Sequence, residues 1–410
     1  MTRSLPPPSP LASHWDHEHD VVYLNHGSFG SCPRAVLEEQ TQQRAQMERE
    51  LVRHYVTRHE GLMDHARHAL ARFVRCDQGG LALLPNASIA VATVLSNVRL
   101  EPGDEILMNA QEYPACQNSV RRAAARAGAS VTYADVPFPI RDSAQVVSAY
   151  EAKVTPRTRL ALVSHVTSPT GLVLPVERVV ASLQARGVDV LVDGAHAPGM
   201  IPTLDLGALR PAYYTANCHK WVCSPKGSAF LYVRDDRREA FRPLVLSNNA
   251  EKPKPGRSQF LTEFDYVGTQ DYTALYSIPK AIEVMADLGG GWPAVMTHNH
   301  DLCVRARGML CESLGVEAPA PESMIGSIAT IVLPPHDEAR RVRLAARPTA
   351  YHDALQDALL ANWGIQVPVW GLAGKPERFV RISTQVYNSR AQYEYLAKAL
   401  RTELDAEARL

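Results

Sequence analysis

The chain has 410 residues, in which 43 basic side chains balance 43 acidic ones, and hydrophobic residues make up 46% of the composition. Nucleic acids and lipid surfaces attract proteins through clustered excess positive charge, so this balance argues against both kinds of partner. A chain of this length exceeds the size at which one hydrophobic core stops growing, and it predicts two domains.

Neither a membrane span nor an export signal is predicted. The longest uncharged stretch, residues 78–98, contains Pro85, Asn86 and Asn97, which a bilayer would penalise. The N-terminal run MTRSLPPPSP lacks the apolar core of a signal peptide. Seven Cys without a CxxC pair indicate reduced thiols, so we expect a cytoplasmic protein.

The first residues predict an irregular, Pro-rich arm, and we assign residues 1–30 to an arm that contributes to a small domain and to the active site. Residues 34–73 have helical periodicity. Helical stretches such as 114–127 and 175–186 then alternate with short apolar runs, at 81–84, 105–108, 131–136, 159–166, 188–192, 213–216 and 229–233. This alternation predicts an α/β fold whose large domain, residues 31–287, holds a mainly parallel, doubly wound sheet.

A second, smaller unit is predicted for residues 288–410. A polar, Pro-rich loop at 248–257 and helices at 272–287 and 293–314 lead into it. Its own elements are strands at 328–333, 365–369 and 379–384 and helices at 351–362 and 390–404. This mixture predicts a small α+β C-terminal domain.

The most informative chemistry lies between residues 188 and 226. The apolar run VDVLVDGAHAPG reaches Asp193 where open α/β sheets bind ligands, and the next run, YYTANCHKW, ends at Lys220. A lysine can form a Schiff base with pyridoxal phosphate (PLP), and an Asp can keep the pyridine nitrogen protonated. A surface lysine and a helix-capping Asp are the ordinary alternative, so the spacing alone leaves both interpretations open.

Other cofactor and catalytic motifs do not fit this sequence. The spacing of Gly194 and Gly199 matches a phosphate loop, but Met and Ile follow where Lys and Ser or Thr are required. No GxGxxG follows a predicted strand, and no GxSxG elbow is present. His14, His17 and His19 lie in the predicted arm without a spaced acidic or Cys partner, so we expect no metal site.

Eight segments together resemble a known family: YLNHGSFGSCP, LLPNASIAV, QEYPA, SHVTSPTG, DGAHAPG, YYTANCHKW, GTQD and VRIST. In this order they resemble class V PLP-dependent aminotransferases, most of all the isopenicillin N epimerase-like group, with cysteine desulfurases more distant. The resemblance covers nearly the whole chain. It implies a PLP-dependent transferase of fold type I with PLP as the cofactor.

The resemblance implies roles for individual residues. Lys220 would be the Schiff-base lysine, Asp193 the partner of the pyridine nitrogen, and His196 a hydrogen-bond partner of the phenolic oxygen. Tyr113 would stack on the cofactor face. Further cofactor contacts are implied for Thr167 and Ser168 near the phenolic oxygen, for Asn217 and His219 at the phosphate, and for Thr269 from the other subunit of a homodimer with composite active sites.

The phosphate site also has a physical basis in the sequence. Asn86, Ala87 and Ser88 lie between an apolar run and a helical stretch. Backbone N–H groups at a helix N-terminus, together with the helix dipole, can hold a phosphate dianion. An ordinary helix cap at Ser88 is compatible with that role.

The resemblance places a substrate carboxylate on Arg381, whose planar guanidinium can make the bidentate bond that Lys cannot. Asn25, His26 and Gly27 would line the substrate side, and His26 is a candidate acid–base residue because imidazole titrates near neutral pH.

The expected substrate is an α-amino acid whose Cα proton is removed by Lys220. Epimerisation or racemisation and C–S β-elimination from a cysteine S-conjugate of a natural-product pathway are both open. Transamination or a non-catalytic PLP-binding regulator are further alternatives. An epimerase needs a second proton-transfer group, for which His26 and Tyr113 are candidates, whereas a lyase needs only Lys220. Desulfurase activity is disfavoured, because no Cys lies in a loop before Arg381.

Overall fold

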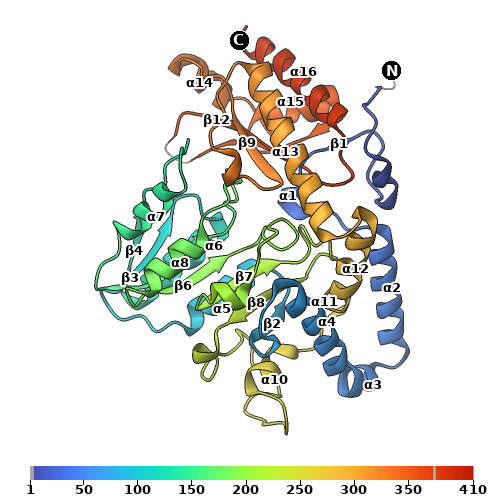
Figure 1. Ribbon diagram of the computed structural model, residues 1–410, viewed down its shortest axis with the longest axis vertical. Helices are drawn as coiled ribbons and strands as arrows, with labels where there is room; N and C mark the ends of the chain where they lie inside the picture. Colours follow the sequence, from blue (N-terminus) through green and yellow to red (C-terminus); the bar gives the residue numbers. More distant parts are fainter. Residues whose placement is uncertain (1–3, 373–374, 410) are drawn as a thin grey trace.

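The computed structural model describes residues 4–372 and 375–409 (Figure 1). A seven-stranded sheet with the order β2-β8-β7-β6-β5-β3-β4 forms the centre of the large domain. Every neighbouring pair is parallel except the two pairs that involve β8. The strands are β2 (Leu81–Leu84), β3 (Glu105–Asn109), β4 (Ser130–Ala134), β5 (Thr158–Ser164), β6 (Asp189–Asp193), β7 (Tyr213–Asn217) and β8 (Ala229–Val233). The mainly parallel α/β sheet is therefore confirmed.

Helices cover both faces of this sheet, because alternate strand residues point to opposite sides. Leu107 and Val163 pack into one hydrophobic core, whereas Met108 and Leu162 pack into the other. The helices against the first core are α2 (Arg34–Arg49), α4 (His59–Val74), α7 (Ala144–Glu151), α8 (Val176–Gln184), α9 (Leu206–Leu209), α11 (Thr273–Tyr276) and α12 (Ile278–Gly289). Those against the second are α5 (Ala87–Asn97), α6 (Pro114–Ala127) and α10 (Gln259–Asp265).

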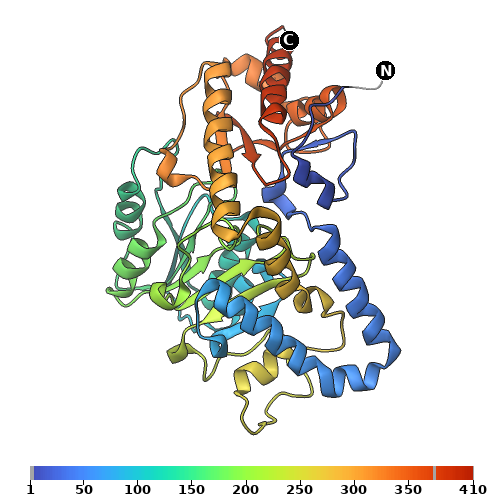
Figure 2. The same ribbon diagram turned by 45° about the vertical axis from the view of Figure 1, so that its right-hand side comes forward.

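The small domain lies above the large one in Figure 1, and the long helix α13 (Trp292–Leu314) extends up along it in both views (Figure 2). Its antiparallel sheet has the order β11-β12-β9, with β9 (Ile328–Val332), β11 (Val369–Gly371) and β12 (Arg378–Ser383). A separate parallel pair joins β1 (Val22–Tyr23) to β10 (Ile365–Gln366), so the N-terminal segment is built into this domain. The remaining helices are α14 (Glu338–Ala345), α15 (Ala354–Trp363) and α16 (Arg390–Glu407).

Three predicted elements differ from the structure, and one of them is the helix expected at 272–287, which is divided at Ser277 into α11 and α12. The helix expected at 34–73 is broken between α2 and α4 into α3 (Leu51–Arg53) and a π-helical turn, η2 (His54–Arg58). The strand expected at 365–369 is split into β10 and β11 at Pro368, which has no N–H to donate to a ladder. The short helical turns are α1 (His26–Phe29), η1 (Pro10–His14), η3 (Gln78–Gly80), η4 (Asp235–Arg237) and η5 (Glu322–Met324). No helix in the described part of the chain combines the length and apolar character of a membrane span.

Candidate active site

A cavity of about 470 Å³ lies where the ends of β5, β6 and β7 meet the small domain. The N-termini of α5 and α6 open onto it, and β12 of the small domain contributes Arg381. The carboxyl ends of parallel strands meet at one edge of a sheet, which explains how residues far apart in the sequence converge here. The predicted site residues that line the cavity are Gly27, Asn86, Ala87, Ser88, Tyr113, Ser168, Asp193, His196, Asn217, His219, Lys220 and Arg381.

Lys220 is partly buried, and its Nζ lies 3.3 Å from Nε2 of His196. Burial and the positive charge of Arg381 lower the pKa of Lys220 to about 8, against the opposing effect of Asp193. The indole N–H of Trp221 donates to Nδ1 of His196 at 3.3 Å, so a neutral His196 carries its proton on Nε2. Burial lowers the pKa of His196 well below its usual value and keeps the ring neutral. The amine is thus easily deprotonated and can act as a nucleophile or base near neutral pH.

Asp193 ends β6 with its side chain buried. Its Oδ1 accepts the backbone N–H of Ala195 at 3.0 Å, and its Oδ2 accepts the thiol of Cys116 at 3.3 Å. Burial raises the pKa of Asp193, and these two donors and the charge of Lys220 oppose the rise. No described Lys, Arg or His makes an ion pair with the carboxylate, so its charge is left for a cation in the cavity.

An anion site faces the N-terminus of α5. Asn86 caps this helix by accepting the N–H of Ile89 at 2.9 Å, and Asn217 accepts the N–H of Ala87 at 2.9 Å. Within the described residues, the backbone N–H and the hydroxyl of Ser88 have no hydrogen-bond partner. Nδ1 of His219 is bonded to the carbonyl of Ser228 at 2.9 Å, which leaves Nε2 uncommitted. Burial lowers the pKa of His219 to about 4, but a dianion at this position would favour the imidazolium, which adds an N–H donor.

Arg381 is a buried cation without a carboxylate partner among the residues described. One Nη donates to the carbonyl of Ser168, the other donates to Oγ of Ser28 at 3.0 Å, and Nε–H has no acceptor. The guanidinium carbon lies 4.6 Å from the centre of the Trp370 ring. Burial lowers the pKa of Arg381 to about 10. Its unused N–H groups and unpaired charge suit an anionic group on a ligand.

The structure departs from the expectation for His26. Its ring is buried behind Lys220, with Nε2 bonded to the Lys220 carbonyl at 3.0 Å and Nδ1 to the hydroxyl of Tyr387 at 2.9 Å. Burial lowers its pKa to about 3, so both nitrogens are committed and the ring is neutral. The segment packs so tightly here that a Cβ at Gly30 would lie 1.9 Å from the His219 carbonyl. The ring as placed offers no free nitrogen to a substrate, which argues against the predicted acid–base role of His26.

Asn25 and Thr167 also lie outside the cavity lining. Oδ1 of Asn25 accepts the hydroxyl of Ser28 at 2.6 Å, so Asn25 orients a cavity residue from behind. Thr167 is buried in a turn, where its hydroxyl is bonded to that of Thr170 at 2.6 Å and accepts the N–H of Leu172 at 2.9 Å. These contacts occupy both side chains, and the direct roles that the resemblance implied for the two residues stay predictions.

Thr269 lies on the surface, away from the cavity of its own chain, with its hydroxyl 2.8 Å from that of Tyr266. A residue that completes the site of another subunit has to be exposed in this way. The contribution of Thr269 to a partner's site stays a prediction.

Several cavity residues were not predicted from the sequence. Ser28, Cys116, His352 and Trp370 line the cavity, and none belongs to a motif that singles it out. Behind the wall, the carboxyl group of Glu112 accepts the N–H of Ser164 at 3.0 Å and an amide N–H of Asn109 at 2.6 Å. Burial, together with the nearby charge of Asp193, raises the pKa of Glu112 to about 8. Only the folded chain brings these groups next to the strand ends.

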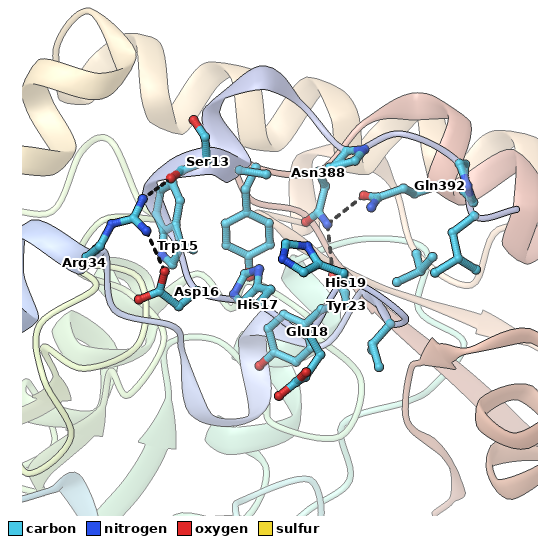
Figure 3. Close-up of a pocket in the computed structure, with 17 residues that line it drawn as sticks. Ser13, Trp15, Asp16, His17, Glu18, His19, Tyr23, Arg34, Asn388 and Gln392 are labelled. Atoms are coloured by element: carbon cyan, nitrogen blue, oxygen red, sulfur yellow. Dashed lines mark hydrogen bonds and ion pairs between the residues drawn. The ribbon is translucent and has the colours of Figure 1, made fainter. Parts of the chain in front are cut away.

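A second cavity, of about 490 Å³, lies under the N-terminal arm (Figure 3). Arg34 and Asp16 form an ion pair at 2.7 Å on one side of it, and Asn388 and Gln392 are hydrogen-bonded at 3.1 Å on the other. His17, from the arm, bonds to Oγ of Ser31 at 2.8 Å. Within the described ranges, no three His, Cys, Asp or Glu side chains are arranged to hold a metal ion. This cavity contains none of the predicted site residues.

The first cavity has the features that PLP requires. The unpaired carboxylate of Asp193 suits a pyridinium nitrogen, the free donors at the start of α5 suit a phosphate, and the amine of Lys220 suits an aldehyde. Arg381 remains on the small-domain side for the carboxylate of an amino acid. Fold and site together define a PLP-dependent enzyme of fold type I.

Comparison with known proteins places the chain within this class. The sequence profile named Aminotransferase class-V matches residues 22–396, and the chain belongs to that family. It is 32% identical to an isopenicillin N epimerase of Streptomyces clavuligerus, over 93% of this chain and 94% of the relative. It is 28% identical to a probable chloroplastic L-cysteine desulfhydrase of Arabidopsis thaliana, over 94% and 83% of the two chains.

Solved structures agree on the fold. The chain matches the cysteine desulfurase CsdA of Escherichia coli with a TM-score of 0.75 at 20% identity, over 96% of this chain and 97% of the other. It matches the cystine C–S lyase C-DES, in complex with its product cysteine persulfide, with the same TM-score at 21% identity, over 93% and 97%. The predicted family, fold type and cofactor are thus confirmed, whereas the relatives carry out different reactions.

Proposed function

We propose that the protein is a C–S β-lyase that acts on a cysteine-derived α-amino acid and releases a thiol, pyruvate and ammonia. The observation that carries this proposal is the position of His26. Inversion at Cα needs two proton-transfer groups on opposite faces, and the sequence offered His26 and Tyr113 as candidates for the second. With both nitrogens of His26 bonded behind Lys220, elimination, which needs only one base at Cα, fits the cavity better.

Each of the charged or polar residues that line the cavity then has one role in the reaction. Arg381 binds the substrate carboxylate and so holds Cα between the two domains. Lys220 removes the Cα proton with its amine, whose pKa is lowered to about 8. Asp193 holds a proton on the pyridine nitrogen, and neutral His196 presents Nε2–H beside Lys220. PLP, when bound, supplies the electron sink for a carbanion at Cα.

A desulfurase mechanism fits the cavity less well. It needs a reactive thiol beside the substrate, and Cys116 is the one Cys among the described residues that line the cavity. Its thiol donates to Asp193, and burial raises its pKa well above the usual value, so it is a poor nucleophile. The L-cysteine desulfhydrases among the relatives support a lyase that leaves no sulfur on the protein.

Amino-acid epimerisation is the second candidate, and two observations favour it. The isopenicillin N epimerases match with 32% and 33% identity, slightly above the 28% to 30% of the plant desulfhydrases. Tyr113 lines the cavity with 46% of its surface exposed and could serve a second face of Cα. Its phenol hydroxyl can both donate and accept a hydrogen bond.

The proposal includes a cytoplasmic homodimer with composite sites. Large apolar side chains are exposed on α1, α3 and η2, with Phe29 at 71%, Leu51 at 47%, Val52 at 76% and Val56 at 74%. Apolar surface of this kind marks protein interfaces. Seven free Cys are consistent with a reducing compartment.

The test is to incubate the PLP-loaded enzyme with S-methyl-L-cysteine in D₂O and to follow thiol, pyruvate and the configuration of the remaining substrate. A lyase releases thiol and pyruvate in equal amounts and leaves no D-isomer. Accumulation of the D-isomer without pyruvate would reject the lyase and support the epimerase. Lys220→Met should abolish either reaction, and Lys226→Met is the matched control, because Lys226 is an exposed lysine outside the cavity lining.

A further inference from the structure

The loop between α14 and α15 brings an unassigned imidazole to the cavity. His352 lies in this loop, is exposed, and lines the same cavity as Lys220 and Arg381. It also borders a neighbouring groove formed by α14 and residues 347–354, so it stands at the rim between the two. No motif surrounds His352, so the sequence alone does not single it out.

His352 differs from the other histidines at this site. His26 and His196 each have both ring nitrogens in contacts with neighbouring groups, and His219 has one nitrogen bonded and the other facing the anion site. Burial lowers the pKa of all three, so they are neutral in the protein alone. The described residues give the His352 ring no hydrogen-bond partner. Its ring nitrogens are therefore free to bond to a ligand in the cavity.

The position of His352 relative to Arg381 indicates which part of the substrate it meets. Its ring centre is 6.3 Å from that of Trp370, in an edge-to-face arrangement, and Trp370 stacks on Arg381. The three side chains form one continuous wall on the small-domain side. With the substrate carboxylate on Arg381, Cβ and its substituent are only a few bonds away, so the substituent lies within reach of this wall.

We propose that His352 is the acid that protonates the sulfur as it leaves, an inference that rests on the proposed C–S lyase activity. Lys220 takes the Cα proton, and the electron pair left at Cα forms a double bond to Cβ. The C–S bond breaks with its electron pair on sulfur, and the imidazolium of His352 gives that sulfur its proton. The products of the step are a neutral thiol and a neutral imidazole, which solvent protonates again.

The test compares leaving groups that differ in their need for a proton. S-Methyl-L-cysteine expels an alkyl thiolate, which is strongly basic, whereas S-(4-nitrophenyl)-L-cysteine expels an aryl thiolate that is stable without a proton at neutral pH. We expect His352→Gln to lower kcat for the alkyl substrate by at least ~100-fold, the lower range for loss of a general acid. For the aryl substrate, kcat should change by less than about 3-fold.

Two controls distinguish a catalytic role of His352 from a structural effect of its substitution. His298→Gln removes another exposed imidazole, on α13 and outside the cavity lining, and it should leave both rates unchanged. The cofactor absorbance and the midpoint of thermal unfolding of His352→Gln should match the wild type, because the side chain is exposed.

The outcomes are distinct for the two proposals. Loss confined to the alkyl substrate supports His352 as the acid. An equal loss of kcat on both substrates, or no loss on either, overturns that role. The lyase activity itself is then still established by the wild-type enzyme. Failure of the wild type to release thiol from either substrate contradicts the proposed function and, with it, the role of His352.

Discussion

Substitution of Arg381 probes the substrate end of the site most sharply. The guanidinium carries five N–H donors, and two of its contacts in the protein, to Ser168 and Ser28, hold it in place. A substrate carboxylate would take the unused donors as a bidentate, charge-assisted pair. Each such bond contributes about 1.5–3 kcal/mol, so the pair contributes at least about 3 kcal/mol.

Arg381→Gln should therefore lower kcat/KM by at least ~150-fold, because each loss of about 1.36 kcal/mol in transition-state stabilisation lowers the rate tenfold. Arg381→Lys should fall between this variant and the wild type, because it keeps the charge but not the planar fork. Removal of the guanidinium should not unfold the protein, because burial already disfavours its charge and lowers its pKa to about 10.

The assay measures thiol release with a chromogenic thiol reagent. The two substrates are S-methyl-L-cysteine and S-methylcysteamine, which is the same amine without the carboxylate. The wild type should strongly prefer the amino acid, and Arg381→Gln should lose that preference while treating the amine as the wild type does. An equal loss on both compounds would exclude a carboxylate-binding role for Arg381, because it would mean that Arg381 acts through folding or through cofactor binding.

Three other substitutions give further predictions. Asp193→Asn should retain PLP through the phosphate contacts but lose at least ~100-fold in turnover, and a near-normal rate would exclude its role at the pyridine nitrogen. Lys220 has a pKa of about 8 in the folded protein, below its ordinary 10.5, so the unfolded chain binds more protons between these values. Relative to Lys220→Met, the free energy of unfolding of the cofactor-free wild type should thus rise between about pH 8 and 10.5, by at most about 1.4 kcal/mol per pH unit. Urea titrations at several pH values measure this difference, and parallel curves for the two proteins would contradict it. Thr269→Ala should weaken PLP retention on gel filtration of a protein that sediments as a dimer, and a fully active monomer would contradict the shared site.

The cofactor side of the site could be predicted because it depends on local patterns. Apolar runs that end in Asp193 and shortly before Lys220 predict parallel strands, and the geometry of such sheets brings strand ends together. The same holds for the start of α5, where a polar turn between a strand and a helix predicts an anion site.

The substrate side could not be predicted in the same way, because it depends on contacts between distant segments. His26 is committed by the hydroxyl of Tyr387, 361 residues away, and by the main chain of Lys220, and no local pattern encodes either contact. His352 reaches the cavity through the docking of a small-domain loop. The resemblance and imidazole chemistry together made His26 the candidate, whereas burial decides which imidazole is free.

Reductive trapping tests whether this cavity is a PLP site built around Lys220. The PLP-loaded protein is treated with borohydride, digested, and searched by mass spectrometry for the pyridoxyl adduct, with Lys220→Met as the control. We expect a single adduct, on Lys220, which is absent from the variant. An adduct on Lys226 or on any other lysine would contradict it.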